Sequence, residues 1–188
     1  INRVDIVKIL PLKLFYILTD IKEHQQHKNI LLSLIDKMEQ SKINDGKDII
    51  SKTDWSLPHN IKREYISFFY SMIKPYMNIM ANKLKCKSWD ISNTWYQTYK
   101  KGDTHSWHIH PEVNYTNVYY VDLPDEAIKT QIYDIVEDKI LDEIQVKEGQ
   151  LFTFPANIIH RSPINTSDKS KTIISFNSNF RNLTELIL

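Results

Sequence analysis

The residues of this 188-residue chain best suited to chemistry are three histidines that could bind one metal ion. His108 and His110 are separated by one residue, and His160 follows fifty positions after His110. Side chains of a β-strand alternate between its two faces, so His108 and His110 would lie on the same face. Neutral imidazole binds Fe, Zn, Cu and Ni, and three protein ligands on one side of a metal leave positions for substrate and oxygen. The spacing therefore predicts a metal site with open positions.

The elements that must position these histidines belong to the second half of the chain. There apolar and polar residues alternate with a period of two, and short turn-forming segments, among them Gly102 and Gly149, separate the alternating stretches. The predicted strands are residues 92–99, 106–110, 116–122, 139–146, 150–154 and 172–180. Many short strands with few helical patterns between them favour a double-sheet jelly roll.

The first half of the chain predicts helices that support this sheet. Apolar residues recur at helical spacing over residues 28–41, and again from Asn60, a suitable N-cap, to about Cys86. Pro75 lies inside the second pattern and predicts a kink or a break. Residues 43–60 have the composition of a loop.

We interpret the chain as one domain that is mainly β with N-terminal α-helices. The parts are assigned as follows: residues 1–188 form a single domain, 1–90 supply N-terminal strands, including one or two over residues 3–18, and the supporting helices, and 91–180 form the jelly-roll core that carries the metal site.

Composition and charge exclude several classes of protein. Hydrophobic residues make up 41% and charged residues 25% of the chain, which is typical of a soluble globular protein and not of a disordered one. The net charge of +1, with no basic run, gives no sign of a nucleic-acid or membrane partner. Because Cys86 is the only cysteine, no internal disulfide can form, and we expect a reducing, cytoplasmic location. Pro11 and Lys13 interrupt the apolar run of residues 9–18, so no signal peptide is expected.

Several motifs of the second half resemble a family of 2-oxoglutarate and Fe(II)-dependent oxygenases, whose signature includes His-x-His-Pro followed by a Tyr-Tyr strand. The matching residues, within about 92–180, are Asn93-Thr94-Trp95, Gly102, His108-Ile109-His110-Pro111, Val118-Tyr119-Tyr120-Val121, Gly149-Gln150-Leu151-Phe152-Thr153-Phe154-Pro155 with His160, and Ile173-Ile174-Ser175-Phe176-Asn177. The resemblance implies a double-stranded β-helix, which is a form of jelly roll. It also implies a hydroxylase that uses Fe(II), 2-oxoglutarate and molecular oxygen.

The resemblance implies an iron-binding set with one departure from the usual pattern. The wider superfamily binds iron through a His-x-Asp/Glu pair and a distal His. If His108 takes the first position, His110 replaces the carboxylate and the set is His108, His110 and His160. If His110 takes the first position, Glu112 supplies the carboxylate. We favour the three-histidine set because it keeps the His-x-His pair of the family together. His105 is expected beside the ligands or in solvent.

The resemblance also implies residues that bind 2-oxoglutarate. A cation about ten residues beyond the distal His usually binds the far carboxylate, and Lys171 lies eleven beyond His160. Ser175 and Asn177 would share a strand face with Lys171. Tyr99 would bond the same carboxylate, with Tyr120 as the next candidate. The substrate entrance is expected near Trp95, Trp107 and residues 111–115, although Trp107 fits a core position better.

Two other classes of function stay open. One is a three-histidine, cupin-type metal dioxygenase that does not use 2-oxoglutarate. The other is a non-enzymatic jelly-roll module for interaction or structure. For the favoured hydroxylase the substrate is an unidentified peptidyl or small-molecule compound, and an exposed sheet edge could pair two chains into a homodimer.

Overall fold

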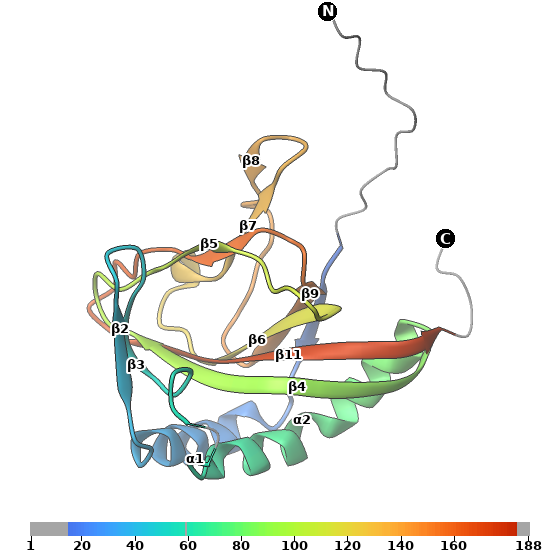
Figure 1. The fold of residues 1–188 in the computed structure, drawn as a ribbon, viewed down its shortest axis with the longest axis horizontal. Helices are drawn as coiled ribbons and strands as arrows, with labels where there is room; N and C mark the ends of the chain where they lie inside the picture. Colours follow the sequence, from blue (N-terminus) through green and yellow to red (C-terminus); the bar gives the residue numbers. More distant parts are fainter. Residues whose placement is uncertain (1–14, 59, 184–188) are drawn as a thin grey trace, which may run out of the picture.

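The structure is a computed structural model that describes residues 15–58 and 60–183. These residues form two antiparallel sheets and two α-helices (Figure 1). The larger sheet has the strand order β1 (Ile17–Asp20), β9 (Gln150–Pro155), β6 (Tyr115–Asp122), β11 (Lys171–Leu183), β4 (Cys86–Tyr99), β3 (Ile49–Thr53) and β2 (Ser41–Asn44). The smaller sheet has the order β5 (His105–His108), β10 (His160–Ser162), β7 (Gln131–Asp134) and β8 (Lys139–Ile140). The prediction of a mainly β protein with helices before the core is confirmed at this level.

The larger sheet separates two apolar cores. Along β6, Tyr119 and Val121 pack with the helices, whereas Val118 and Tyr120 point to the opposite side and pack between the two sheets. Helices α1 (His24–Asp36) and α2 (Glu64–Lys83) cover the first face, and the smaller sheet lies over the second (Figure 1). A fully buried large apolar side chain contributes about 1.5–3 kcal/mol, so both faces of the sheet are stabilised by packing. The space between the two sheets is where a functional site can lie.

Helix α2 differs from its sequence prediction at its start and at its proline. Its N-cap residue is Arg63, without a side-chain capping bond, so the assignment of Asn60 as the cap is wrong. The helix also runs through Pro75 without a break. Buried side chains on both sides of the proline, such as Met72 and Met77, continue the same apolar face against the sheet, and this packing outweighs the missing backbone donor.

The loop predicted over residues 43–60 is wrong in part, because β2 and β3 pair there as a hairpin; residues 54–58 lie outside the strands. The turn of the hairpin is closed by Asp45, whose carboxylate accepts hydrogen bonds from the backbone N–H groups of Lys47 and Asp48. Two backbone hydrogen bonds between Ile49 and Thr104 tie the hairpin to the chain just before β5. The N-terminal half therefore reaches the histidine-bearing strand directly.

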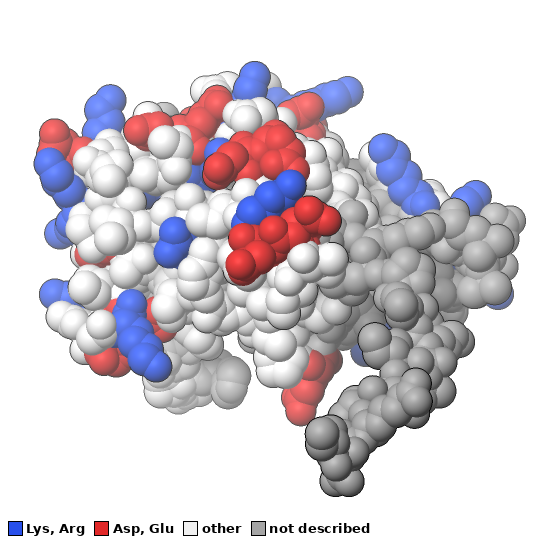
Figure 2. All heavy atoms as spheres, turned by 90° about the horizontal axis from the view of Figure 1, so that it is seen from above, with Lys and Arg blue, Asp and Glu red and all other residues white. Residues whose placement is uncertain are grey.

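Other boundaries also shift from those predicted. Strands β4 and β11 are longer than expected, β4 crosses residue 90, and the predicted strand at 139–146 shortens to the two residues of β8. Strand β7 was not predicted, α1 begins four residues before position 28, and most of the strand region predicted at 3–18 lies outside the described residues. Neither helix of the described chain is long and apolar enough to cross a membrane. On the face shown in Figure 2, basic and acidic side chains lie side by side without a large area of one sign.

Candidate metal centre

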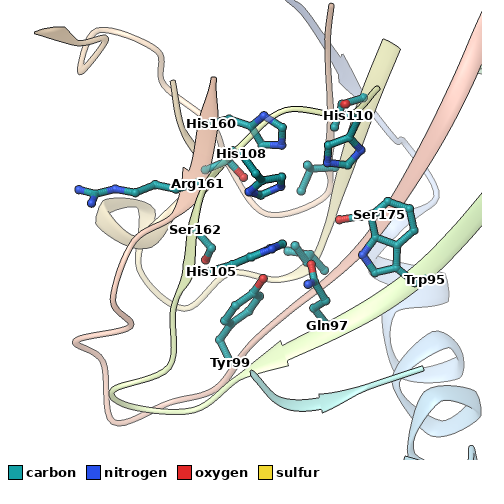
Figure 3. Close-up of a pocket in the computed structure, with 14 residues that line it drawn as sticks. Trp95, Gln97, Tyr99, His105, His108, His110, His160, Arg161, Ser162 and Ser175 are labelled. Atoms are coloured by element: carbon teal, nitrogen blue, oxygen red, sulfur yellow. The ribbon is translucent and has the colours of Figure 1, made fainter. Parts of the chain in front are cut away.

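The smaller sheet brings the three histidines together from distant positions. His160, the first residue of β10, lies opposite His108, the last residue of β5. His110 lies two residues beyond β5, where its backbone N–H donates to the carbonyl of Ala156 at 2.9 Å. Each histidine offers one nitrogen, and these three nitrogens lie within 4.8 Å of one another. Figure 3 shows the three rings around one point.

Hydrogen bonds leave one ring nitrogen of each histidine available for a metal. The three bonds run from Nδ1 of His108 to the Ser106 carbonyl at 2.6 Å, from Nδ1 of His160 to the Ile158 carbonyl at 2.9 Å, and from Nδ1 of His110 to Oδ1 of Asn177 at 2.5 Å. A carbonyl oxygen only accepts, so Nδ1 of each ring carries the proton. The lone pair of each neutral ring is then on Nε2, as in metal sites whose ligands are oriented by a carbonyl partner.

Burial keeps these rings neutral and therefore able to bind a metal. Desolvation lowers the pKa of His108 and of His110, and for His160 desolvation and the neighbouring His108 lower the pKa well below 6.5. Protonated imidazole cannot coordinate, so a lowered pKa favours metal binding at neutral pH.

His105 lies beside the ligands and not in solvent. Its ring is buried and stacks on the His108 ring, with 4.0 Å between centroids and an interplanar angle of 23°. Desolvation and the neighbouring His108 lower the pKa of His105 to about 4. The ring is therefore a neutral neighbour of the cluster at physiological pH.

Glu112 lies apart from the histidine cluster. It is exposed in the turn after Pro111, and its backbone has a positive φ of 68°. Its carboxylate is not among the donor atoms that lie within 4.8 Å of one another. The described residues thus bring together three imidazoles, and the carboxylate of Glu112 is not part of this cluster.

A small cavity of about 20 Å³ adjoins the histidines between the two sheets. Four side chains in its wall carry a buried polar atom that makes no hydrogen bond to the described residues: Trp95 Nε1, Gln97 Nε2, Tyr99 Oη and Thr116 Oγ1. Figure 3 shows three of them, Trp95, Gln97 and Tyr99, around the space below the rings. Leaving a buried polar group unpaired costs about 1–3 kcal/mol. Such a set indicates a polar ligand that completes these bonds.

Lys171 lies behind the wall of this cavity, against its lining residues Tyr99 and Ser162, and is only 1% exposed; Arg161 is the basic side chain among the described lining residues. The Nζ of Lys171 donates to the Ile128 carbonyl at 2.8 Å and to Ser162 Oγ, and it lies 4.5 Å from the centre of the Tyr99 ring. Burial lowers the pKa of Lys171 to about 7 and raises the pKa of Tyr99, so the phenol stays a donor. Ser175 on the same strand lines the cavity.

Tyr120 and Asn177, two further candidates for binding 2-oxoglutarate, both lie outside the lining of the inner cavity. The Tyr120 hydroxyl donates to Thr130 Oγ1 at 2.8 Å and accepts from the Thr130 backbone N–H, and Tyr120 does not line the cavity. Asn177 lies beside the metal cluster, where it accepts from His110. Its contact is thus with a candidate ligand and not with the inner cavity.

A second hollow, of about 300 Å³, lies on the outer side of the histidines. We call it the outer groove; it is lined by Asp48, Trp55, Asn93, Trp95, His105, Ser106, His108, Ile109, His110, Pro111 and Asn177. Trp95, His105, His108 and His110 border both the groove and the inner cavity, so the cluster lies between them. The sequence did not predict that Asp48, Trp55 and Gln97 would lie near the histidines, because their spacing along the chain shows no relation to the histidine positions.

Trp107 is neither in the core nor at the entrance, so both predictions for it are wrong. It is 37% exposed and lines neither hollow. The guanidinium of Arg161 lies 4.4 Å from its ring centre, and its ring contacts Tyr133 edge-on. Trp107 alternates with its neighbours along β5 and so faces outward from the smaller sheet.

Comparison with solved structures shows a shared fold at low sequence identity. A 2OG-Fe(II) oxygenase family oxidoreductase from Burkholderia pseudomallei has a TM-score of 0.67 and 10% identity, over 89% of this chain and 86% of that one. A Pseudomonas putida prolyl-4-hydroxylase has a TM-score of 0.62 and 9% identity, over 89% and 93%. The non-heme alpha ketoglutarate dependent epimerase SnoN from nogalamycin biosynthesis has a TM-score of 0.64 and 11% identity, over 90% and 81%. No protein-family profile matches the sequence. No curated protein matches it either. The chain therefore has the fold found in 2-oxoglutarate-dependent oxygenases.

Proposed function

We propose that this protein is an Fe(II)- and 2-oxoglutarate-dependent dioxygenase, built on a double-stranded β-helix core over residues 91–180 with supporting elements before it. The observation that carries the proposal is the set of three imidazoles with Nδ1 already bonded and Nε2 free, next to a cavity lined by unpaired polar atoms. The fold shared with oxygenases of this class supports it.

His108, His110 and His160 would hold the iron. The donor set fits, because three neutral imidazoles suit Fe(II) and leave room for other ligands. The alternative set with Glu112 has less support, since that carboxylate is exposed and outside the cluster. When bound, iron supplies the oxygen chemistry of the net reaction: 2-oxoglutarate, O₂ and a substrate C–H group give succinate, CO₂ and the hydroxylated substrate.

2-Oxoglutarate would bind beside the histidines with its far carboxylate directed into the inner cavity, which at about 20 Å³ must widen to admit it. In its ammonium form Lys171 pairs with the far carboxylate as a point charge, and the Tyr99 hydroxyl donates to the same group. Gln97 and Ser175 lie where they can bond the rest of the molecule. Asn177 keeps the His110 ring in its tautomer. The Tyr120 hydroxyl already makes two hydrogen bonds to Thr130, so Tyr120 would support the residues around the inner cavity and not contact 2-oxoglutarate.

The substrate would enter from the outer groove. The structurally similar proteins include a prolyl-4-hydroxylase and an epimerase of nogalamycin biosynthesis. We therefore propose a peptidyl or small-molecule substrate and no narrower class. We propose hydroxylation as the reaction, in the reducing cytoplasm, and a homodimer that pairs through an exposed sheet edge.

The test is anaerobic addition of Fe(II) and then 2-oxoglutarate, with the weak visible charge-transfer band of the chelate as the readout. We expect the band in the wild type and in Glu112→Gln, and no band in His160→Ala. Succinate formation in air should follow the same pattern.

Other outcomes select the other functions. If iron binds, 2-oxoglutarate changes no spectrum and Lys171→Met has no effect on turnover, the protein is a three-histidine dioxygenase of another kind. If metal raises only the melting temperature and nothing turns over, the histidines serve structure.

A further inference from the structure

The carboxylate of Asp48 borders the outer groove without a cationic partner. Its Oδ1 accepts the Ser106 backbone N–H at 2.7 Å, which fixes the side chain against β5. Its Oδ2 is 3.8 Å from His105 Nε2, which is beyond hydrogen-bond distance. No Lys or Arg among residues 15–58 and 60–183 lies within 4.0 Å of it, and the side chain is 20% exposed. A partly desolvated anion of this kind gains from a cation that enters the groove.

An indole ring forms another wall of the same groove. Trp55 is 50% exposed and stacks on Trp95, with 5.8 Å between centroids and an angle of 24°. Trp95 in turn stacks on His110 at 5.7 Å. Trp55 also lies 5.9 Å from the ring of His105, the histidine that Asp48 approaches. Indole is the aromatic ring that attracts a cation most strongly.

The Trp55 indole is held in place by its buried neighbour Asp54. One Asp54 oxygen accepts from the Tyr65 hydroxyl at 2.7 Å and from Arg63 Nε at 2.9 Å, and the other accepts from the Tyr96 backbone N–H at 2.9 Å. Asp54 is fully buried, so these bonds are strong and the segment after β3 is fixed. A preorganised wall loses little entropy when it binds a ligand.

We propose that the outer groove binds a cationic end of the substrate, an ammonium or guanidinium group, between Asp48 and Trp55. The rest of the lining carries no Lys or Arg side chain that would repel a cation. The proposal deepens the proposed oxygenase function, because the groove opens onto the histidine cluster. The group could belong to a lysine or arginine side chain in a peptide or to a free amine.

The test is calorimetric titration of the full chain with probes that pair a cationic side chain with a neutral one of similar size. The probes are blocked tripeptides centred on lysine and on arginine, the neutral norleucine and citrulline counterparts, and butylamine as the free amine. We expect each cationic tripeptide to bind about tenfold more tightly than its neutral counterpart. Tighter binding of the tripeptides than of butylamine would assign the cation to a peptide, and the reverse to a free amine.

Variants assign the binding to the two groups. Asp48→Asn keeps an acceptor for Ser106 and removes the charge, so we expect about a tenfold loss of affinity for the lysine tripeptide and none for the norleucine one. Trp55→Leu should weaken both cationic tripeptides. Glu137→Gln, which removes an exposed carboxylate outside the groove, serves as the matched control and should bind as the wild type does.

The proposal is overturned if no cationic probe binds saturably, if norleucine and lysine tripeptides bind equally to the wild type, or if Asp48→Asn binds lysine as tightly as the wild type. The comparison of probes on the wild type does not depend on the folding of any variant. Cation binding without the 2-oxoglutarate band would refute only the oxygenase proposal. The band without charge selectivity would refute only the assignment of the groove.

Discussion

Replacement of Lys171 by Met should remove a pH-dependent penalty from the folded state, together with the buried cation behind the inner cavity. Burial lowers the pKa of this lysine from 10.5 to about 7. Each tenfold change in proton affinity is worth about 1.4 kcal/mol, so the charged form costs the folded state about 5 kcal/mol. The penalty is fully present below about pH 7, shrinks as the pH rises, and vanishes near 10.5, because the unfolded chain binds the extra proton over that interval.

The measurement is urea unfolding of wild type and Lys171→Met across this pH range. The wild type should gain stability relative to the variant by about 1.4 kcal/mol per pH unit above about pH 7. Loss of the bonds to Ile128 and Ser162 adds a cost of about 1–3 kcal/mol each, which does not depend on pH and leaves the slope unchanged. Lys169→Met, at an exposed position on the same segment, should show no such slope. A pH-independent difference between Lys171→Met and the wild type would refute the reasoning.

Three further predictions concern the cosubstrate, a ligand and a turn. The 2-oxoglutarate dissociation constant should rise about tenfold per pH unit above about pH 7, as equilibrium titration would measure, because the buried lysine must take up a proton to pair with a carboxylate. Asn177→Leu removes the acceptor that orients His110 and should weaken Fe(II) or Co(II) binding about 10- to 100-fold, with binding partly restored in Asn177→Asp. Gly149→Ala should lower the unfolding free energy by about 1–3 kcal/mol, since φ is +82° and the new Cβ would lie 2.8 Å from His24; Gly46→Ala, at a similar φ in open space, should lose less. Equal losses in the two glycine variants would contradict the crowding at Gly149.

The histidine cluster could be predicted from the sequence because it depends on local strand geometry. Two ligands two residues apart need only one extended segment, and the period-two alternation of that region indicated one. The same alternation along β11 accounts for the neighbouring positions of Lys171, Ser175 and Asn177 along one face.

Features that depend on long-range pairing could not be predicted. The Asp45 turn closes a hairpin that was interpreted as a loop, and only its pairing with the chain before β5 brings Asp48 to the groove. Trp55 depends in the same way on the buried Asp54 bonds to three distant residues. His105 shares the ligand side because β5 and β10 pair with a register shift, and a strict period of two gives no sign of such a shift.

The proposed site coincides with the places where this chain departs from what stability alone would favour. An unpaired phenol at Tyr99 and an unpaired indole N–H at Trp95 line one cavity, and the desolvated Lys171 contacts that lining at Tyr99 and Ser162. A carboxylate without a Lys or Arg partner among the described residues, Asp48, borders the groove beyond it. Each of these costs free energy in the empty protein and is offset when a ligand of opposite charge or matching polarity binds. The inner set is suited to an anion and the outer set to a cation, with the histidines between them. A ligand on each side would therefore relieve a different part of the cost.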